Sequence, residues 1–105
     1  MDTTKYVAEL IGTFAFVLAI FLIVDWVGTK NQIALAVAIG AALAVLVWAT
    51  VNFGGDGHLN PAFTVTRLYA EFNQPGRIAH YAAYIIAQVV GALAAYYVHD
   101  VATRR

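Results

Sequence analysis

The sequence predicts an all-α membrane protein with three transmembrane helices and one shorter helix that enters the bilayer without crossing it. The composition is 62% hydrophobic and 11% charged over 105 residues, whereas a soluble domain is about half apolar and a quarter charged. Three stretches are also long enough to cross a hydrocarbon core of roughly 30 Å, which needs about 20 apolar residues. Finally, an Asn-Pro pair opens a further apolar run that is too short to span.

The first two spans are predicted at residues 6–24 and 33–53. The first is followed by Trp26, whose ring suits the headgroup level of a bilayer, and it contains a single charge, Glu9. The second span contains no charged residue and is rich in alanine. Its Gly40 offers a place where another helix could approach closely.

The third span is predicted at residues 78–98 and contains one amide side chain, Gln88. Tyrosines stand towards both ends of this stretch, where aromatic side chains suit the two membrane interfaces. They are Tyr81, Tyr84, Tyr96 and Tyr97.

Residues 54–69 fit neither a span nor an ordinary loop. Asn60 can cap a helix, and Pro61 suits the first helical position, so a helix is predicted to begin there. Up to Tyr69 it would rise about 12 to 14 Å, close to half the hydrocarbon thickness. The backbone of residues 54–59 would then lie at membrane depth, which is tolerated where it is buried in protein or lines a wet cavity. A surface loop followed by an interfacial helix is the alternative.

Three segments, in this order, carry a family resemblance. They are Ala8 to Phe14 (AELIGTF), Gly57 to Val65 (GHLNPAFTV) and Ala87 to Ala92 (AQVVGA). The whole chain, residues 1–105, resembles a single repeat of the aquaporin and aquaglyceroporin family, the major intrinsic proteins. Members of that family normally carry two such repeats, inverted in the membrane. Here one Asn-Pro-Ala is present.

Two interpretations of the single repeat remain open: a half that pairs with a second copy, or a truncated product without activity. Orientation in the membrane follows the bias of Lys and Arg between the two sides. Three basic residues fall on each side, so both orientations are allowed and an inverted homodimer is predicted, although a short chain can also balance by accident. The basic residues are Lys5, Arg67 and Arg77 on one side and Lys30, Arg104 and Arg105 on the other.

The resemblance implies a passive channel in a lipid bilayer for water or small neutral solutes such as glycerol. Two copies of the tripeptide Asn60, Pro61 and Ala62 would meet at the midplane, and the family's tetramers imply four pores per particle. The strand that descends to the tripeptide would be residues 54–59, in which Gly57, His58 and Leu59 would line the pathway and the carbonyl of His58 would face it.

The resemblance also assigns a constriction and a support for the loop. By the family's spacing, the constriction falls on Gly40, Trp48, Gly57 and Phe63. Second repeats usually place an arginine where this chain has Phe63, so the expected constriction is apolar and suits glycerol-like solutes as readily as water. Glu9 would accept hydrogen bonds from the loop, or else be solvated near the membrane surface. Gln88 would support the loop or join two helices.

Other functions are disfavoured by what the sequence contains. Six basic and six acidic residues cancel, which gives no reason to expect a nucleic-acid partner. Cysteine is absent, and no histidine or carboxylate stands at ligand spacing from His58, so we expect no metal site and no cofactor. No nucleophile, base and orienting group converge as in an enzyme.

Two rival functions remain: a non-conducting or regulatory membrane fragment, and a small dimeric ion channel or transporter. Asp56 could attract cations or face the membrane interface, whereas Arg67 reads as a structural residue near the outer end of the short helix.

Overall fold

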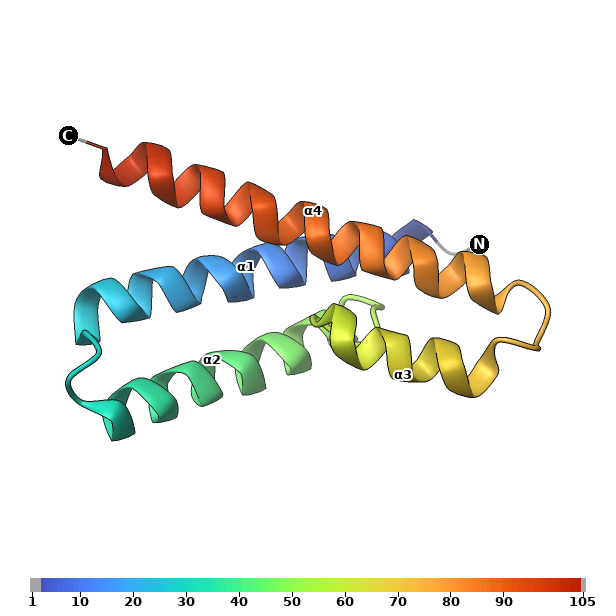
Figure 1. Cartoon of the computed structure of the whole chain (residues 1–105), viewed down its shortest axis with the longest axis horizontal. Coiled ribbons are helices and arrows are strands. Elements are labelled where there is room, and N and C mark those ends of the chain that lie inside the picture. Colours follow the sequence, from blue (N-terminus) through green and yellow to red (C-terminus); the bar gives the residue numbers. More distant parts are fainter. Residues whose placement is uncertain (1–2, 105) are drawn as a thin grey trace.

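The computed structural model describes residues 3–104, which form α1 (Thr3–Val27), α2 (Gln32–Asn52), α3 (Pro61–Glu71) and α4 (Arg77–Thr103). Figure 1 shows the four helices in chain order. By length and composition, α1, α2 and α4 can each cross a membrane. The 11 residues of α3 rise about 16 Å, roughly half the hydrocarbon thickness. This is the predicted fold class of three spans and one half-length helix.

Each long helix extends beyond at least one end of the apolar stretch predicted for it, and α3 continues to Glu71 instead of ending at Tyr69. An apolar stretch marks the part of a helix inside the hydrocarbon, whereas hydrogen bonding continues into the headgroup region. The charged residues Lys5 and Asp25 accordingly lie within α1, near its two ends.

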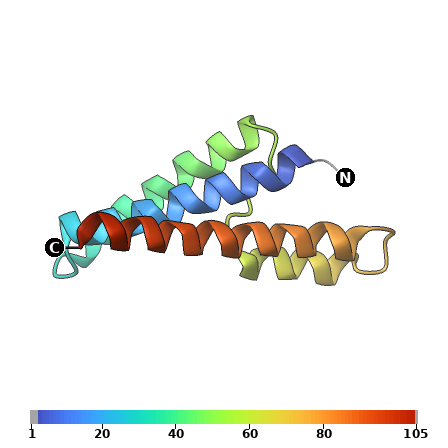
Figure 2. The same cartoon turned by 90° about the horizontal axis from the view of Figure 1, so that it is seen from above.

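Helix α1 contacts both of the other long helices, whereas α3 contacts α4. In Figures 1 and 2, α1 and α4 run side by side in the same direction, and α2 returns along α1 after a tight turn. The helix pairs in contact are α1 with α4, α1 with α2, and α3 with α4. Helix α3 occupies only the end of the molecule that holds the amino terminus, so the chain between α2 and α3 must fold back into the molecule.

Small residues set the closest helix contacts. Ala87, Gly91 and Ala95 repeat every fourth residue on the buried face of α4, a pattern that lets membrane helices approach closely. A Cβ on Gly91 would lie 2.5 Å from the carbonyl oxygen of Leu10 in α1. By contrast, a Cβ on Gly40 would meet nothing within 4 Å. The expectation that Gly40 supports a close helix contact is therefore wrong within this chain.

The tyrosines of α4 divide into two pairs. Tyr97 is 65% exposed and Tyr96 is also exposed, so their place at a membrane interface stays a prediction. Tyr84 is 0% exposed and Tyr81 is also buried, so their assignment to an interface is wrong. Both lie on the face of α4 that covers the loop, where the hydroxyl of Tyr84 donates to Asp56 and that of Tyr81 donates to Glu71.

Two faces of the chain have no cover. Thr50 is the one buried residue of α2, and Thr64 is the one buried residue of α3. The rest of both helices presents mostly apolar side chains outward. Exposed apolar surface on this scale marks contact with a membrane or with another protein.

Candidate functional site

The 53–60 loop enters the molecule from the end of α2 and delivers Asn60 to the start of α3. The Oδ1 atom of Asn60 accepts a hydrogen bond from the amide of Ala62 at 2.9 Å, and Pro61 occupies the first helical position. This is the helix start that the Asn-Pro pair predicts. The Nδ2 group of Asn60 has no hydrogen bond to residues 3–104 and stays available as a donor.

A buried carboxylate holds the loop from behind. Glu9 is 0% exposed; its Oε2 accepts from the amide of His58 at 3.2 Å, and its Oε1 accepts from the amide of Leu59 at 3.0 Å. The alternative in which Glu9 is solvated at the membrane surface is therefore wrong. Bonds to an ionised acceptor are roughly twice as strong as neutral ones, so Glu9 ties α1 firmly to the loop.

Gln88 and Thr64 extend this support into the other two elements. The Nε2 of Gln88 donates to Glu9 at 3.1 Å and to the Oγ1 of Thr64 at 2.8 Å. Gln88 thus joins helices and supports the loop region at once, so its two expected roles are compatible. Sequence reasoning missed Thr64, a fully buried residue of α3. The available signal was a hydroxyl residue four positions after the helix-capping Asn60.

The backbone of the loop is held in a strained shape. Leu59 has φ = 55°, the left-handed region, which is costly for a residue with a branched side chain. Its amide is bonded to Glu9 and its side chain fills the space beside Gly12, where a Cβ would come within 2.6 Å of it. Gly57 also has positive φ and packs against Val47 and Val51 of α2. Tertiary contacts therefore impose the conformation of this loop.

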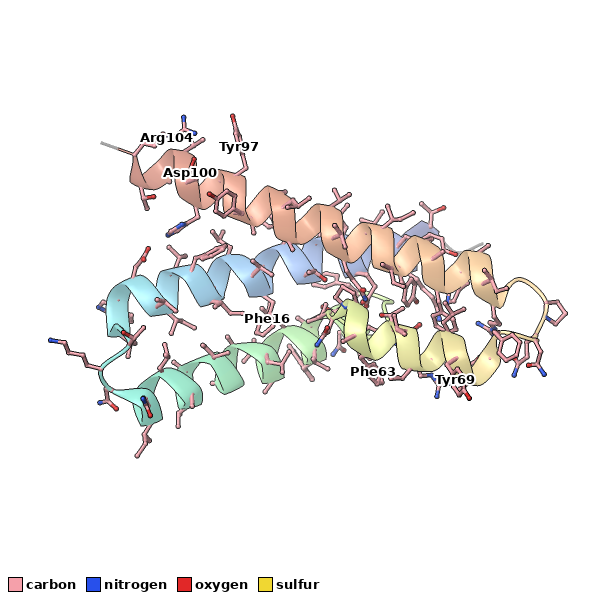
Figure 3. All side chains as sticks on the ribbon, in the orientation of Figure 1. Phe16, Phe63, Tyr69, Tyr97, Asp100 and Arg104 are labelled. Carbon is pink, nitrogen blue, oxygen red and sulfur yellow. The ribbon has the colours of Figure 1, made fainter. Side chains whose placement is uncertain are left out.

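The other residues assigned to the constriction lie on the open faces and do not meet within one chain. Trp48 is 69% exposed and Phe63 is 46% exposed, and α2 and α3 do not pack on each other. Figure 3 places Phe63 and Tyr69 on the side of α3 that faces away from α4. The ring of Phe63 meets that of His58 edge to face, with centroids 4.9 Å apart.

The charged residues around the loop are paired. Burial would raise the pKa of Asp56, but hydrogen bonds from Tyr84 and Lys5 outweigh it and hold that pKa below its usual value. Lys5 lies 3.3 Å from the Asp56 carboxylate. Glu71 at the end of α3 pairs with Arg67 at 2.6 Å and with Arg77 at 3.5 Å. Arg67 is therefore paired with Glu71 on the same helix, and Asp56 is paired with Lys5.

Comparison with known proteins identifies the family to which the chain is similar. The model described as "Major intrinsic protein" matches residues 2–105. A protein named "Glycerol uptake facilitator protein-like 6" from Lactiplantibacillus plantarum is 38% identical over 94 residues, which cover 87% of this chain and 40% of that protein. "Aquaporin Z" from Rhodopseudomonas palustris is 38% identical over 101 residues, covering 90% of this chain and 40% of that protein.

This chain thus spans about two fifths of the length of these relatives. No solved structure matches it significantly. Because the family model extends over the chain from residue 2 to residue 105, the chain belongs to the major intrinsic protein family.

Proposed function

We propose that this chain forms a passive channel for water or small neutral solutes, in which two copies inserted in opposite directions complete one pore. The observation that carries the proposal is the 53–60 loop, which is folded into the molecule against Glu9 and ends at the exposed Asn60. The names of the relatives, a glycerol uptake facilitator and an aquaporin, support this class of solute.

Asn60 is the residue that would meet the solute at the midplane. Its Oδ1 is committed to the amide of Ala62, so its Nδ2 can donate to a passing oxygen. The amino end of α3, between Asn60 and Pro61, adds the positive end of a helix dipole at the same point. Donors together with a positive potential oppose the passage of cations and protons through pores of this type.

Glu9 would determine which groups of the loop face the pathway. It binds the amides of His58 and Leu59. In a trans peptide the carbonyl of one residue and the amide of the next point in opposite directions, so the carbonyl of His58, which shares a peptide with the Leu59 amide bound to Glu9, would be turned away from Glu9 and towards the pathway. Gly57 leaves room for this backbone to lie against α2. Gln88 holds the carboxylate in place.

A second copy supplies what one chain lacks. Helix α3 reaches about half the bilayer, so a pore of this kind needs a second half-helix from the opposite side. The open faces of α2 and α3 are where that copy would pack, and packing there would bring Gly40, Trp48 and Phe63 to the pore mouth. With Phe63 in place of an arginine the constriction is apolar, which suits glycerol-like solutes as well as water.

The distribution of charge supports insertion in both directions. Lys5, Arg67 and Arg77 gather at the end that holds Asp56 and Glu71, where each has an acidic partner. Lys30 and Arg104 lie at the opposite end, and Arg105, assigned to the same side, lies outside the described residues. The Lys and Arg count gives no strong bias. Four such pores per particle would follow the family's usual assembly.

The test compares two asparagines with the same structural task. Asn60 caps α3 and Asn31 caps α2, where its Oδ1 accepts from the amide of Ala34 at 3.0 Å. Losing either cap costs about 1 kcal/mol of stability, but only Asn60 would face the pore. The full chain and the variants Asn60→Ala and Asn31→Ala are reconstituted in liposomes, and vesicle shrinkage is followed by stopped-flow light scattering.

We expect the unmodified chain and Asn31→Ala to shrink much faster than empty vesicles, and Asn60→Ala to approach the empty-vesicle rate. Shrinkage of the unmodified chain at the empty-vesicle rate would overturn the proposal and favour a non-conducting membrane fragment. An ionic current across a planar bilayer would instead favour the ion channel, and Asp56→Asn would then be the variant to examine.

A further inference from the structure

The hydroxyl of Thr64 holds three polar groups together behind the loop. This fully buried residue has its Oγ1 2.8 Å from the Nε2 of Gln88, 3.2 Å from the carbonyl oxygen of Asn60 and 3.0 Å from the Nδ1 of His58. The amide of Gln88 is oriented by Glu9, whose carboxylate accepts from the same nitrogen. The nitrogen of Gln88 therefore faces Thr64 as a donor.

The number of hydrogens available around the Thr64 hydroxyl determines which tautomer of His58 fits. A hydroxyl has one hydrogen to donate and two lone pairs to accept with. Gln88 occupies one lone pair of Thr64, and the carbonyl of Asn60, which can only accept, takes the single hydrogen. The contact with His58 is then a hydrogen bond only if Nδ1 carries a hydrogen and donates it to the second lone pair.

The opposite tautomer makes one hydrogen bond fewer. With the hydrogen on Nε2, the Nδ1 of His58 and the carbonyl of Asn60 would both need the one hydrogen of Thr64. The carbonyl of Asn60 keeps the amide of Thr64 as a donor in either case, so no group is left without a partner, but one of the two contacts of Thr64 ceases to be a hydrogen bond. With the hydrogen on Nδ1, all three contacts of Thr64 are hydrogen bonds at once.

We infer that Thr64 fixes His58 as a neutral imidazole with its hydrogen on Nδ1, which leaves Nε2 as a bare hydrogen-bond acceptor in the loop. Nε2 has no hydrogen bond to residues 3–104. The ring cannot turn freely, because it meets Phe63 and Tyr84 edge to face with centroids 4.9 and 5.2 Å apart and lies nearly parallel to Tyr81.

The tautomer of His58 has a consequence for solute selection, which rests on the proposed function. Asn60 offers a donor through Nδ2, and His58, two residues earlier in the same loop, offers an acceptor through Nε2. A hydroxyl group donates and accepts at once, so this pair favours solutes that carry hydroxyls, water and glycerol among them. Thr64 is then a positioning residue that acts through His58.

The tautomer is measured by nitrogen NMR on the full chain labelled with ¹⁵N-histidine in lipid bilayers at about pH 8, where imidazoles are neutral. The signals of His58 are identified by their loss in His58→Asn. We expect the hydrogen on Nδ1 in the unmodified chain and in Thr64→Ser, and on Nε2 in Thr64→Val. His99 gives an internal contrast, because its Nε2 lies 2.6 Å from the Asp25 carboxylate, which can only accept when ionised.

A hydrogen on Nε2 of His58 in the unmodified chain, which needs no variant to fold, would overturn the inference. So would an unchanged tautomer in a folded Thr64→Val.

Solute flux tests the consequence separately. In His58→Asn the shorter amide can replace Nδ1 as the donor to Thr64 but has no group in place of Nε2. We expect its permeability to both water and glycerol to fall about fivefold, as for one lost hydrogen bond, whereas His99→Asn at the far end keeps both permeabilities. Unchanged water and glycerol permeabilities in His58→Asn would reject the acceptor while leaving the channel intact. A non-conducting unmodified chain would reject the proposed channel and with it this consequence, and the NMR result would still decide the tautomer.

Discussion

Glu9 illustrates how one residue positions an entire loop. A carboxylate inside a membrane helix is costly unless it has partners. Glu9 has three donors, two from the loop backbone and one from Gln88, and none of the ion pairs among residues 3–104 includes it. Its charge is therefore compensated by hydrogen bonds that simultaneously hold Leu59 in a conformation the residue would not adopt alone.

Replacing Glu9 by Gln should lower the free energy of unfolding strongly, although the two side chains are similar in size. The new NH2 group would face a loop amide or Gln88, all of which are donors, so at least one bond to a charged acceptor is lost. We expect the free energy of unfolding to fall by about 2 to 3 kcal/mol. The matched control is Asp100→Asn, which breaks an exposed pair with Arg104 and should cost less than about 1 kcal/mol.

Both variants are compared by titration with SDS in mixed micelles, followed by circular dichroism. Equal losses for the Glu9 and Asp100 variants would contradict the role assigned to Glu9 in holding the loop.

At the scale of the elements, two glycines that both lie inside apolar helices have different surroundings. Gly91 in α4 touches the backbone of α1, whereas Gly40 in α2 faces open space. Backbone cannot move aside as a flexible side chain does, so any Cβ at residue 91 must push α1 and α4 apart. The same change at residue 40 meets nothing within the chain.

We expect Gly91→Ala to lower the free energy of unfolding by about 1 to 3 kcal/mol through overpacking. Gly40→Ala should cause no loss, since alanine is the better helix former. If Gly40 lines the constriction of an inverted pair, however, Gly40→Ala should reduce solute flux while leaving stability unchanged. SDS titration and stopped-flow shrinkage of the same two variants separate these effects. A Gly91→Ala chain as stable as the unmodified one would contradict the close contact.

At the scale of the whole molecule, this member of the major intrinsic protein family is an integral membrane protein whose uncovered faces require neighbours. Lipid satisfies the outer faces, but the loop and α3 reach only part of the way across. A small excess of Lys or Arg on one side decides in which direction a chain inserts in the membrane. Changing this excess therefore tests whether the proposed second copy is inverted.

Charge added at one end of the molecule should abolish water permeability, and co-expression of two variants charged at opposite ends should restore it. The double variants Asn73→Lys with Gln74→Lys and Thr29→Lys with Gln32→Lys add positive charge at opposite ends of the molecule. Each should insert in one direction and, expressed alone, give membrane vesicles with background water permeability, because no inverted pairs can form. Expressed together, they should restore permeability. The control replaces Asn73 and Gln74 by serine. Full permeability from either charged variant alone would contradict the inverted pair.

The sequence by itself determined the fold class, the approximate spans, the start of α3 and the likeness to the family. These features depend on local physics: the length of an apolar stretch against the thickness of a bilayer, and the chemistry of Asn60 and Pro61 at a helix start. The roles of Gly57, Trp48 and Phe63 in a pore stay predictions, because they depend on a partner chain.

The tertiary structure decided which side chains face inward and what holds the loop. Glu9 meets Leu59 across a separation of 50 residues and Gln88 across 79. The burial of Tyr84, the left-handed backbone of Leu59 and the hydroxyl contacts of Thr64 all follow from these long-range contacts. Sequence patterns report periodicity and local chemistry, whereas the face that a residue buries is set by which distant segment packs against it.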